Sequence, residues 1–595
     1  MLEWPDLTGS ASPISLELLD DAWLRDILEL WDPSSLIYTG DQLDEDEAQR
    51  RGLGDNPLWK YVVRNPNPDP LRSILASVRG QYGAFCIAEA PYVDQAFLRS
   101  HADYHIGSFS RRAATCVRLH FWRHPEPATV GQQLVELLLR GCSRSEEDLR
   151  AELGDLGYLG YSVLRSLRSY VVGRTAIRFN TQFIGRGGTC PHTSAEDDTF
   201  PILTVRSQRE ANVLSCRLTV QPTCEFVQTE PALGQCATSA LCVTTEHMGR
   251  RFGTRRPSYA ALTRIASGIA QVTDDAFGRS LVRDGDGLSA REIQDALLWS
   301  GLQARIIRVS RSGRAERERV SHELYSAIES GLPATLALFE PTGETVGHAV
   351  VAVGHSLPTK VQKENVPTAS LMYPRVSQRH VLVSSFVNLY YCHDDRYGPY
   401  NRCELGQDAE LKDRFHFIAA YVGRTRTPQE LSEVIIAQPP MVRNGPDDML
   451  DTVLEYWDRH VGPELPQGLG GRFAVWRSFL VSGSHFKHSV VSRAFNPELR
   501  AWYALRHLPR YVWVFEFSLV TEYQAAFSFD GAGESSPPSR PIHGEVLCDA
   551  TCSPHEPTVV TMRMLGKCWD GGLRFEDYGD VGEIECCQLP LDDRF

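Results

Sequence analysis

The sequence lacks long runs of apolar residues. Apolar stretches such as 349–353 have the length of a β-strand, far below the roughly 20 residues that a membrane-spanning helix needs. The segment Met1 to Leu7 contains no basic stretch followed by an apolar one, so no secretory signal is visible. We therefore expect a cytoplasmic protein with no membrane partner.

Cysteine does not follow the pattern of a disulfide framework. The chain has 15 cysteines in 595 residues, an odd number with irregular spacing. Small secreted proteins with structural disulfides have denser and more regular cysteines. A reducing compartment is the simplest interpretation, and a nucleophilic thiol also survives best there.

The charge balance gives little sign of a polyanionic partner. The chain has 75 Asp and Glu against 61 Lys and Arg, a formal net charge of −14. This argues against nucleic acid as the main partner. Arg250, Arg251, Arg255 and Arg256 lie close together and could hold an acidic ligand, but a solvated helix end explains them more simply.

Motifs for bound cofactors are also missing. No Gly-rich loop of the kind that cradles phosphate is present. The segment 284–287 (Asp-Gly-Asp-Gly) lacks the later oxygen ligands of a calcium loop, and Leu288 occupies one of those positions. Cys548, Cys552 and His555 do not have the paired spacing of a zinc knuckle. We predict no cofactor and no metal.

A chain of 595 residues is too long for a single hydrophobic core, so several domains are expected. Hydrophobic residues make up 42% and charged residues 23%, as in ordinary globular proteins. We predict an α+β, multidomain chain. Its expected parts are an N-terminal helical segment (1–57), an α+β domain (58–220), a central domain (221–425) and a C-terminal α+β domain (426–595).

In the central domain, helices are expected first and an antiparallel sheet second. Helices are predicted from Ala237 onward, at 259–266, at 289–298 and at 324–330, and strands at 333–339, 348–353 and 379–391. Ser289 and Glu292 have the spacing of a capping box, which fixes the start of the third helix. Elsewhere, strands are predicted at 84–89, 115–122, 159–165, 172–178, 213–220 and 511–518, and helices at 16–31, 130–139, around Glu430 and at 449–456.

Cys236 is the candidate nucleophile. It stands where the turn-like segment 229–234 runs into the helix predicted from Ala237. A thiol in the first turn of a helix is close to unpaired backbone N–H groups and to the positive end of the helix dipole, and both favour the nucleophilic thiolate. The competing interpretation is a buried, inert cysteine, which is the common state of free cysteines.

His348 and an aspartate supply the expected base and the group that orients it. His348 follows Gly347 at the start of a strand of alternating Val and Ala, where its ring can face the nucleophile. Asp394 and Asp395 follow a later strand, and either carboxylate could fix the imidazole tautomer. Because side chains alternate along a strand, we expect only one of them to face His348, and Asp394 is preferred over Asp395.

The fourth requirement is a donor to the oxyanion. Gln228 precedes Cys236 by a short segment, and its side-chain amide could act together with the backbone N–H of Cys236. Gln235 is the alternative. It is adjacent to the nucleophile, and neighbouring side chains usually point away from one another, so Gln228 is preferred.

These motifs resemble the papain-like cysteine peptidase superfamily, and in particular the branch of bacteriocin-leader-processing and related bacterial peptidases. The resemblance covers residues 221–425 and rests on Gln228, on 236–241 (Cys-Ala-Thr-Ser-Ala-Leu), on 347–354 (Gly-His-Ala-Val-Val-Ala-Val-Gly) and on Asp394. It implies a papain-like central domain and a Cys-His-Asp thiol hydrolase. Two features depart from the pattern: Ala237 stands where papain has an aromatic residue, and a polar insertion separates His348 from Asp394.

The expected activity is hydrolysis of peptide or isopeptide bonds in a protein or peptide substrate, and the long flanking regions suggest a dedicated partner protein. A second hypothesis is acyl transfer, including transglutaminase-like chemistry, with the same three residues. In transglutaminases a tryptophan follows the cysteine, whereas in this chain Ala237 occupies that position. A third hypothesis is an inactive papain-fold scaffold.

Overall fold

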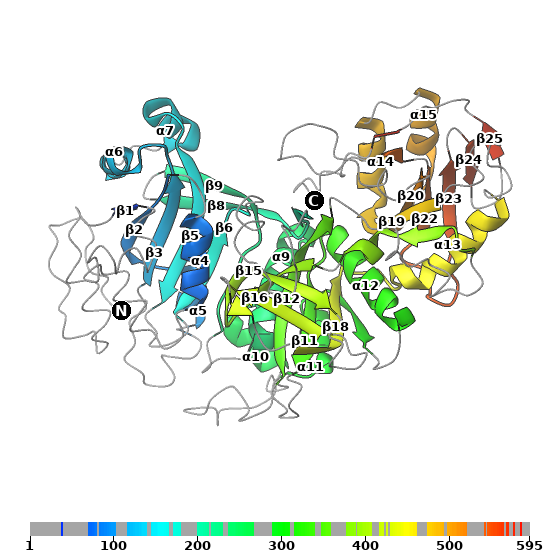
Figure 1. The fold of residues 1–595 in the computed structure, drawn as a ribbon, viewed down its shortest axis with the longest axis horizontal. Helices are drawn as coiled ribbons and strands as arrows, with labels where there is room; N and C mark the ends of the chain where they lie inside the picture. The colour runs from blue at the N-terminus through cyan, green and yellow to red at the C-terminus, as the bar shows by residue number, and fades with distance from the viewer. Residues whose placement is uncertain are drawn as a thin grey trace. The chain divides into compact units, whose positions relative to one another are not determined.

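The structure is a computed structural model, shown in Figure 1. It describes residues 37–39, 69–79, 83–100, 102, 116–139, 144–165, 171–179, 199–213, 216–229, 236–266, 288–309, 314–339, 347–358, 377–387, 389–406, 416–421, 424–425, 429–460, 473–492, 497–520, 541–542, 544–564, 567–570, 575–577 and 584–585.

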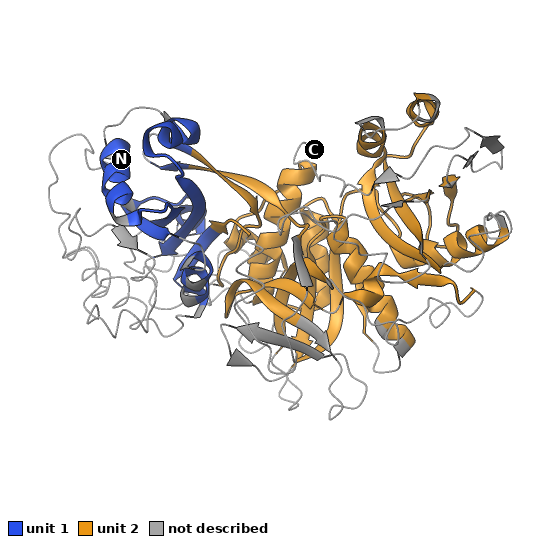
Figure 2. Ribbon diagram, turned by 45° about the horizontal axis from the view of Figure 1, so that its top comes forward, with its two compact units in different colours: residues 1–175, 212–217, 272–280 blue, residues 176–211, 218–271, 281–595 orange. Residues whose placement is uncertain are grey.

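The chain forms two compact units, coloured separately in Figure 2. The first contains 1–175, 212–217 and 272–280, and the second contains 176–211, 218–271 and 281–595. Both mix helices with mostly antiparallel sheets, so the coarse prediction of a mixed, multidomain-sized chain is confirmed. The finer division into four domains stays a prediction.

The first unit is built on one antiparallel sheet. Its strands follow the order β1 (Ile37–Thr39), β2 (Ala84–Tyr92), β3 (Cys116–Arg123), β5 (Gly157–Arg165) and β6 (Val172–Ile177), the last two residues of β6 belonging to the second unit. The accompanying helices are α4 (Asp69–Arg79), α5 (Gln95–Ser100), α6 (Pro127–Leu139) and α7 (Glu146–Leu153). Helix α4 buries Leu71, Ile74, Leu75 and Val78 at helical spacing, which is why this segment packs as an amphipathic helix.

The second unit has a ring of strands at its centre. The sheet runs β10 (Gln303–Arg308), β18 (Gln429–Gln438), β11 (Ala334–Phe339), β12 (His348–Pro358), β14 (Leu389–Asp394), β15 (Gly398–Gly406), β16 (His416–Tyr421) and β17 (Arg424–Thr425). Strand β16 also pairs with β18, so the six strands from β18 to β16 close on themselves. Strand β7 (Thr199–Leu203) pairs with the second half of β12.

Four helices accompany this ring: α9 (Cys236–Phe252), α10 (Tyr259–Ala266), α11 (Ala290–Trp299) and α12 (Arg314–Glu329). Helix α9 packs against β12 (Figure 1). The predicted capping box is confirmed: the Ser289 hydroxyl accepts from the backbone N–H of Glu292, and the Glu292 carboxylate accepts from the backbone N–H of Ser289. Strands β8 (Ser207–Val213) and β9 (Cys216–Thr223) precede the helices.

The C-terminal part of the second unit has a sheet of its own. Its order is β13 (His380–Leu382), β19 (Phe473–Ser482), β20 (Tyr511–Val520), β22 (Gly544–Asp549), β23 (Val559–Met564), β24 (Lys567–Asp570) and β25 (Phe575–Asp577). The helices here are α13 (Pro446–His460), α14 (Gly483–Ser492) and α15 (Pro497–Leu505). A cluster that includes Phe479, Phe486 and Tyr503 joins α14 and α15 to β19.

Three predicted elements are wrong in part. The single strand predicted at 379–391 is β13, a short 3-10 helix (Val383–Phe386) and β14, because His380 is held in the C-terminal sheet by Asp458 and Trp476. The helix predicted around Glu430 is strand β18, where pairing with β10 and β11 overrides the local preference. The strand predicted at 213–220 is divided between β8 and β9.

The remaining predicted elements agree with the structure, apart from the helix predicted at 16–31, which lies outside the described residues. Within 1–57 the described residues are those of β1. The helix predicted at 324–330 is longer than expected and begins at Arg314. No helix in the described part of the chain is long and apolar enough to cross a membrane.

Candidate active site

Cys236 is the first residue of α9, and its side chain is half-buried. The backbone N–H of Ala349, on β12, donates a hydrogen bond to Cys236 Sγ at 3.3 Å. A helix N-terminus and an N–H donor both favour negative charge on the sulfur. The helix and the strand therefore place the thiol in a position suited to a nucleophile.

His348 opens β12, next to Ala349. Strand β12 pairs with β14 in a register that sets Val351 opposite His393. Carried one residue further, this register brings Asp394 opposite Val350, on the same face of the sheet as His348, because side chains alternate. The pairing of two strands thus brings the imidazole and a carboxylate together.

The imidazole and Asp394 form a buried hydrogen-bonded pair. His348 Nε2 and Asp394 Oδ1 are 3.0 Å apart, and each residue is 3% exposed. The backbone N–H of Arg396 donates to the same carboxylate oxygen at 2.9 Å, which fixes its orientation. Burial lowers the pKa of His348, but Asp394 and the Cys236 sulfur outweigh this and raise it to about 10.

The other ring nitrogen is the one that can serve the sulfur. Nε2 is engaged by Asp394, and Cys236 is among the groups that raise the pKa of His348. Nδ1 is therefore the ring nitrogen that Asp394 leaves available to Cys236. Cys236, His348 and Asp394 thus have the arrangement of a thiol, a base and a carboxylate that orients the base.

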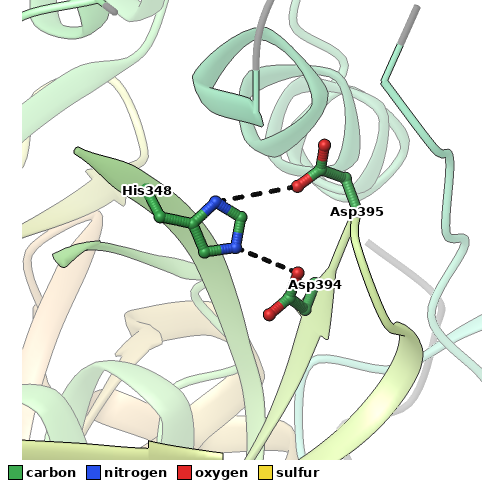
Figure 3. A group of neighbouring side chains, drawn as sticks. All are labelled: His348, Asp394 and Asp395. Atoms are coloured by element: carbon green, nitrogen blue, oxygen red, sulfur yellow. Dashed lines mark hydrogen bonds and ion pairs between the residues drawn. The ribbon is translucent and has the colours of Figure 1, made fainter. Parts of the chain in front are cut away.

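Asp395 lies near the imidazole as well, which differs from the expectation that only one of the two neighbours would do so. Its Oδ1 is 3.9 Å from His348 Nδ1, and Figure 3 shows one carboxylate facing each ring nitrogen. Asp394 is the last residue of β14, and Asp395 belongs to the turn that follows. Strand alternation ends there, so both side chains can lie close to the ring, one at each nitrogen.

Gln228 lies in the segment 224–229, shortly before α9, and is fully buried. The hydroxyl of Ser239, in the first turns of α9, donates to the carbonyl of Val227. This bond ties the segment to the helix that begins with Cys236, but the role of Gln228 as an oxyanion donor stays a prediction. Gln235, the alternative donor, lies outside the described residues.

His348, Asp394 and Asp395 are also spaced as metal ligands could be, since their ligand atoms lie within 4.8 Å of one another. Figure 3 shows, however, that the two ring nitrogens face different carboxylates. Nε2 already shares a hydrogen bond with Asp394 at 3.0 Å, and a metal ion would need a ring nitrogen and both carboxylates to converge on one point. The arrangement fits an imidazole held by hydrogen bonds better than a metal centre.

His393, a neighbour in sequence, does not belong to this group. It lies opposite Val351 on the other face of the sheet and packs against Phe226 and Tyr400. Burial lowers its pKa to about 3, so it is neutral. Its Nδ1 accepts the backbone N–H of Tyr400 at 3.3 Å, which indicates a structural role.

A second array of catalytic residue types was missed by the sequence reasoning. His322 Nδ1 is 2.6 Å from Asp447 Oδ1, and His322 Nε2 is 2.8 Å from Ser478 Oγ. This is the order of a Ser-His-Asp triad, but Ser478 lies buried in β19 and shares a further hydrogen bond with Ser326. The array joins α12 and α13 to the C-terminal sheet, and we interpret it as structural.

The other sequence candidates for ligand binding are engaged in local contacts. Arg250 and Arg256 both pair with Glu246, and Arg251 donates to the carbonyls of Ser330 and Gly331. Arg255 lies over the ring of Trp299. These contacts agree with the helix-end interpretation rather than with an acidic-ligand site.

The cysteines considered for zinc are also in local contacts. Cys548 is buried in β22, and Cys552 Sγ donates to the carbonyl of Asp549 at 3.0 Å. Asn444 Nδ2 donates to the same sulfur at 3.4 Å.

Comparisons of the chain with protein-family models, with curated proteins and with solved structures find no match.

Proposed function

We propose that this protein is a papain-like cysteine hydrolase that cleaves peptide or isopeptide bonds in a protein substrate. The observation that supports it best is the meeting of Cys236, His348 and Asp394 at the start of α9, the start of β12 and the end of β14. Side chains distant in sequence form the thiol, base and orienting carboxylate of a nucleophilic mechanism.

In the proposed mechanism, the Cys236 thiolate attacks the carbonyl carbon while the imidazolium of His348 carries the proton. The carbonyl oxygen becomes negatively charged, and the backbone N–H of Cys236 with the Gln228 amide is proposed to bind it. His348 Nδ1 then donates its proton to the leaving amine, the C–N bond breaks, and an acyl-enzyme remains on sulfur. Asp394 holds Nε2 throughout.

Hydrolysis of the acyl-enzyme completes the cycle. Neutral His348 takes a proton from water, the hydroxide oxygen bonds to the acyl carbon, and the tetrahedral intermediate then expels the thiolate. The same proton returns the imidazole to its charged state.

Ten described cysteines, Cys236 among them, form no disulfide. This supports a reducing compartment, and we propose the cytoplasm.

The test compares the wild type with Cys236→Ala in a cell lysate and maps new protein termini by mass spectrometry. We expect termini that depend on Cys236. The matched control is Cys242→Ala, which removes another half-buried thiol from the same helix and should leave the pattern unchanged.

Three results would contradict the proposal. Identical termini with wild type and Cys236→Ala would exclude proteolysis by this site. New amide links to an added primary amine, in place of new termini, would favour the acyl-transfer hypothesis. If an electrophilic probe also labels Cys236 no faster than Cys242, the inactive-scaffold hypothesis is the better one.

A further inference from the structure

Two buried polar atoms face each other beside the proposed nucleophile. His348 Nδ1 and Asp395 Oδ1 are 3.9 Å apart, and Figure 3 shows the ring edge turned toward this carboxylate. Their residues are 3% and 6% exposed. Within the described part of the chain, neither atom makes a geometrically sound hydrogen bond to a protein group.

The separation is too long for a direct hydrogen bond and suits a single bridging water. A water oxygen at a normal distance of roughly 2.8 Å from each atom spans a gap of this size. Buried polar atoms left without protein partners are the usual hosts of ordered water. Asp394 cannot serve this purpose, because its Oδ1 is engaged with the other ring nitrogen, Nε2.

We propose that Asp395 positions the water that hydrolyses the acyl-enzyme. The inference rests on the proposed function and gives the two neighbouring aspartates separate tasks. Asp394 orients the imidazole, and Asp395 orients the nucleophile of the second half-reaction. Asp395 is thus a positioning residue that favours water as the acyl acceptor.

The proton movements balance. After acylation, His348 is neutral and its Nδ1 lone pair accepts one hydrogen of the water, while Asp395 Oδ1 accepts the other. The O–H bond to Nδ1 breaks as the oxygen bonds to the acyl carbon, and the C–S bond then breaks to release the thiolate. Asp395 accepts a hydrogen bond throughout and takes no proton.

The surroundings of Asp395 set the pH range in which it can do this. The charged and titratable groups that face it in the described chain are His348 on β12 and Asp394 and Arg396 beside it, and Thr229 contributes a hydroxyl. Burial raises the pKa of Asp395 to about 6, helped by Asp394 and opposed by His348, Arg396 and Thr229. A protonated carboxyl carries one O–H donor, so both of its oxygens act as acceptors only when it is ionised, and the water is oriented above that pH.

The experiment separates the two half-reactions with p-nitrophenyl acetate. A burst of nitrophenol reports acylation of Cys236, and the later steady rate reports hydrolysis. In Asp395→Asn, we expect the burst to be unchanged and the steady rate to fall roughly 10–100-fold, as for a misplaced reacting group. Intact-mass spectrometry should show the acetylated protein accumulating, and added hydroxylamine should release the acetyl group equally fast from both proteins.

The pH profile gives a second measurement, which does not depend on the folding of Asp395→Asn. In the wild type, the steady rate should rise with pH while the burst amplitude stays constant. The rise should lie above about pH 6, because the neutral imidazole of the acyl-enzyme no longer lowers the pKa of Asp395. Thr229→Val removes a hydroxyl that lowers the pKa of Asp395, so it should move this rise to higher pH.

The outcomes are distinguishable. If the wild type gives no burst, or if Cys236→Ala gives the same burst, the proposed function itself fails. If the burst depends on Cys236 but wild type and folded Asp395→Asn have the same steady rate and pH profile, the role of Asp395 is refuted and the proposed function stands. A slower burst in Asp395→Asn would also refute the water-positioning role, because it would place the residue in acylation.

Discussion

The backbone N–H of Ala349 donates to Cys236 Sγ at 3.3 Å, and this bond joins the first residue of α9 to the second residue of β12. The sulfur is thus located by the main chain of the strand, independently of the imidazole that precedes it. Substitutions of His348 or its carboxylate partners are therefore expected to change proton transfer while leaving the thiol in place.

Asp394→Asn should lower the pKa of His348 from about 10 toward its ordinary value of 6.5, because Asp394 gives the largest contribution that raises it. We expect the turnover of a cleaved peptide to fall roughly 10³-fold or more, since the imidazole loses its orienting carboxylate. NMR titration of the imidazole measures the first effect and peptide cleavage the second.

The matched control for Asp394→Asn is Asp447→Asn, which removes a carboxylate from a different buried histidine, His322. It should reduce stability and leave the titration of His348 unchanged. A His348 titration that is the same in Asp394→Asn as in the wild type would contradict the assignment.

Gln228→Ala should reduce kcat by roughly 10²–10³-fold with little change in KM, because an oxyanion donor acts mainly on the transition state. Gln235→Ala is the comparison, since sequence reasoning left both glutamines open. The measurement is steady-state kinetics on one peptide substrate. If Gln235→Ala has the larger effect on kcat, the two assignments must be exchanged.

The stability of the protein should depend on pH through His348. Its pKa is about 10 in the folded protein and 6.5 as the ordinary value, so the folded state binds the proton more tightly. The resulting stability is fully present below pH 6.5 and is lost as the pH rises toward 10. At about 1.4 kcal/mol per pKa unit, the loss is roughly 3–5 kcal/mol.

Urea unfolding at several pH values measures this loss. His348→Gln should flatten the decline between pH 6.5 and 10, whatever its effect on stability at lower pH. An equally steep decline in the variant would assign the pH dependence to other groups.

Arg477→Met should destabilise the second unit. Arg477 donates to Glu329 at 3.0 Å, and Glu329 also pairs with His355 of β12 at 2.6 Å. Burial raises the pKa of Glu329, but Arg477 and His355 outweigh it and hold the pKa at about 2. Removing the guanidinium leaves a buried carboxylate short of a partner, which typically costs about 3–5 kcal/mol.

Thermal unfolding followed by circular dichroism checks the effect of Arg477→Met. The control is Arg308→Met, at a side chain that is 87% exposed and 3.6 Å from Glu433. It should change the free energy of unfolding by less than about 1 kcal/mol. Equal changes in the free energy of unfolding for the two substitutions would show that the buried ion pair contributes no more to stability than the exposed one.

Local signals in the sequence predicted much of the second unit. Ser289 and Glu292 marked the start of α11, and alternating Val and Ala predicted the strand that begins at His348. The capping box and the strand pattern are each defined by residues close together in the sequence, so a single sequence is enough to predict them. The helix predicted from Ala237 likewise begins one residue earlier, at Cys236.

Contacts between segments far apart in the sequence were harder to predict from the sequence. Glu430 belongs to a segment with helix-forming residues, yet it lies in β18, where it pairs with Phe339 of β11 on one side and His416 of β16 on the other. His380 was assigned to the strand of Asp394, but its contact with Trp476 places it in another sheet. The array of His322, Asp447 and Ser478 has no sequence motif, because its members come from three separate elements.

The turn after β14 shows the limit of the alternation argument. Alternation predicted that one of the two aspartates would face His348 without deciding which; Asp394 was preferred, and Asp394 does hydrogen-bond to His348. It did not foresee that Asp395 would lie 3.9 Å from the other ring nitrogen, because the chain leaves the strand at that point and side-chain direction follows the turn instead.

Strand β12 has neighbours along both edges in its middle section. Residues Val351 to His355 pair with β14 on one side, while β11 and β7 share the other. An incoming polypeptide cannot extend this sheet by adding itself as another strand there. In the proposed hydrolase, a scissile segment would therefore be recognised through contacts other than strand pairing along this section of β12.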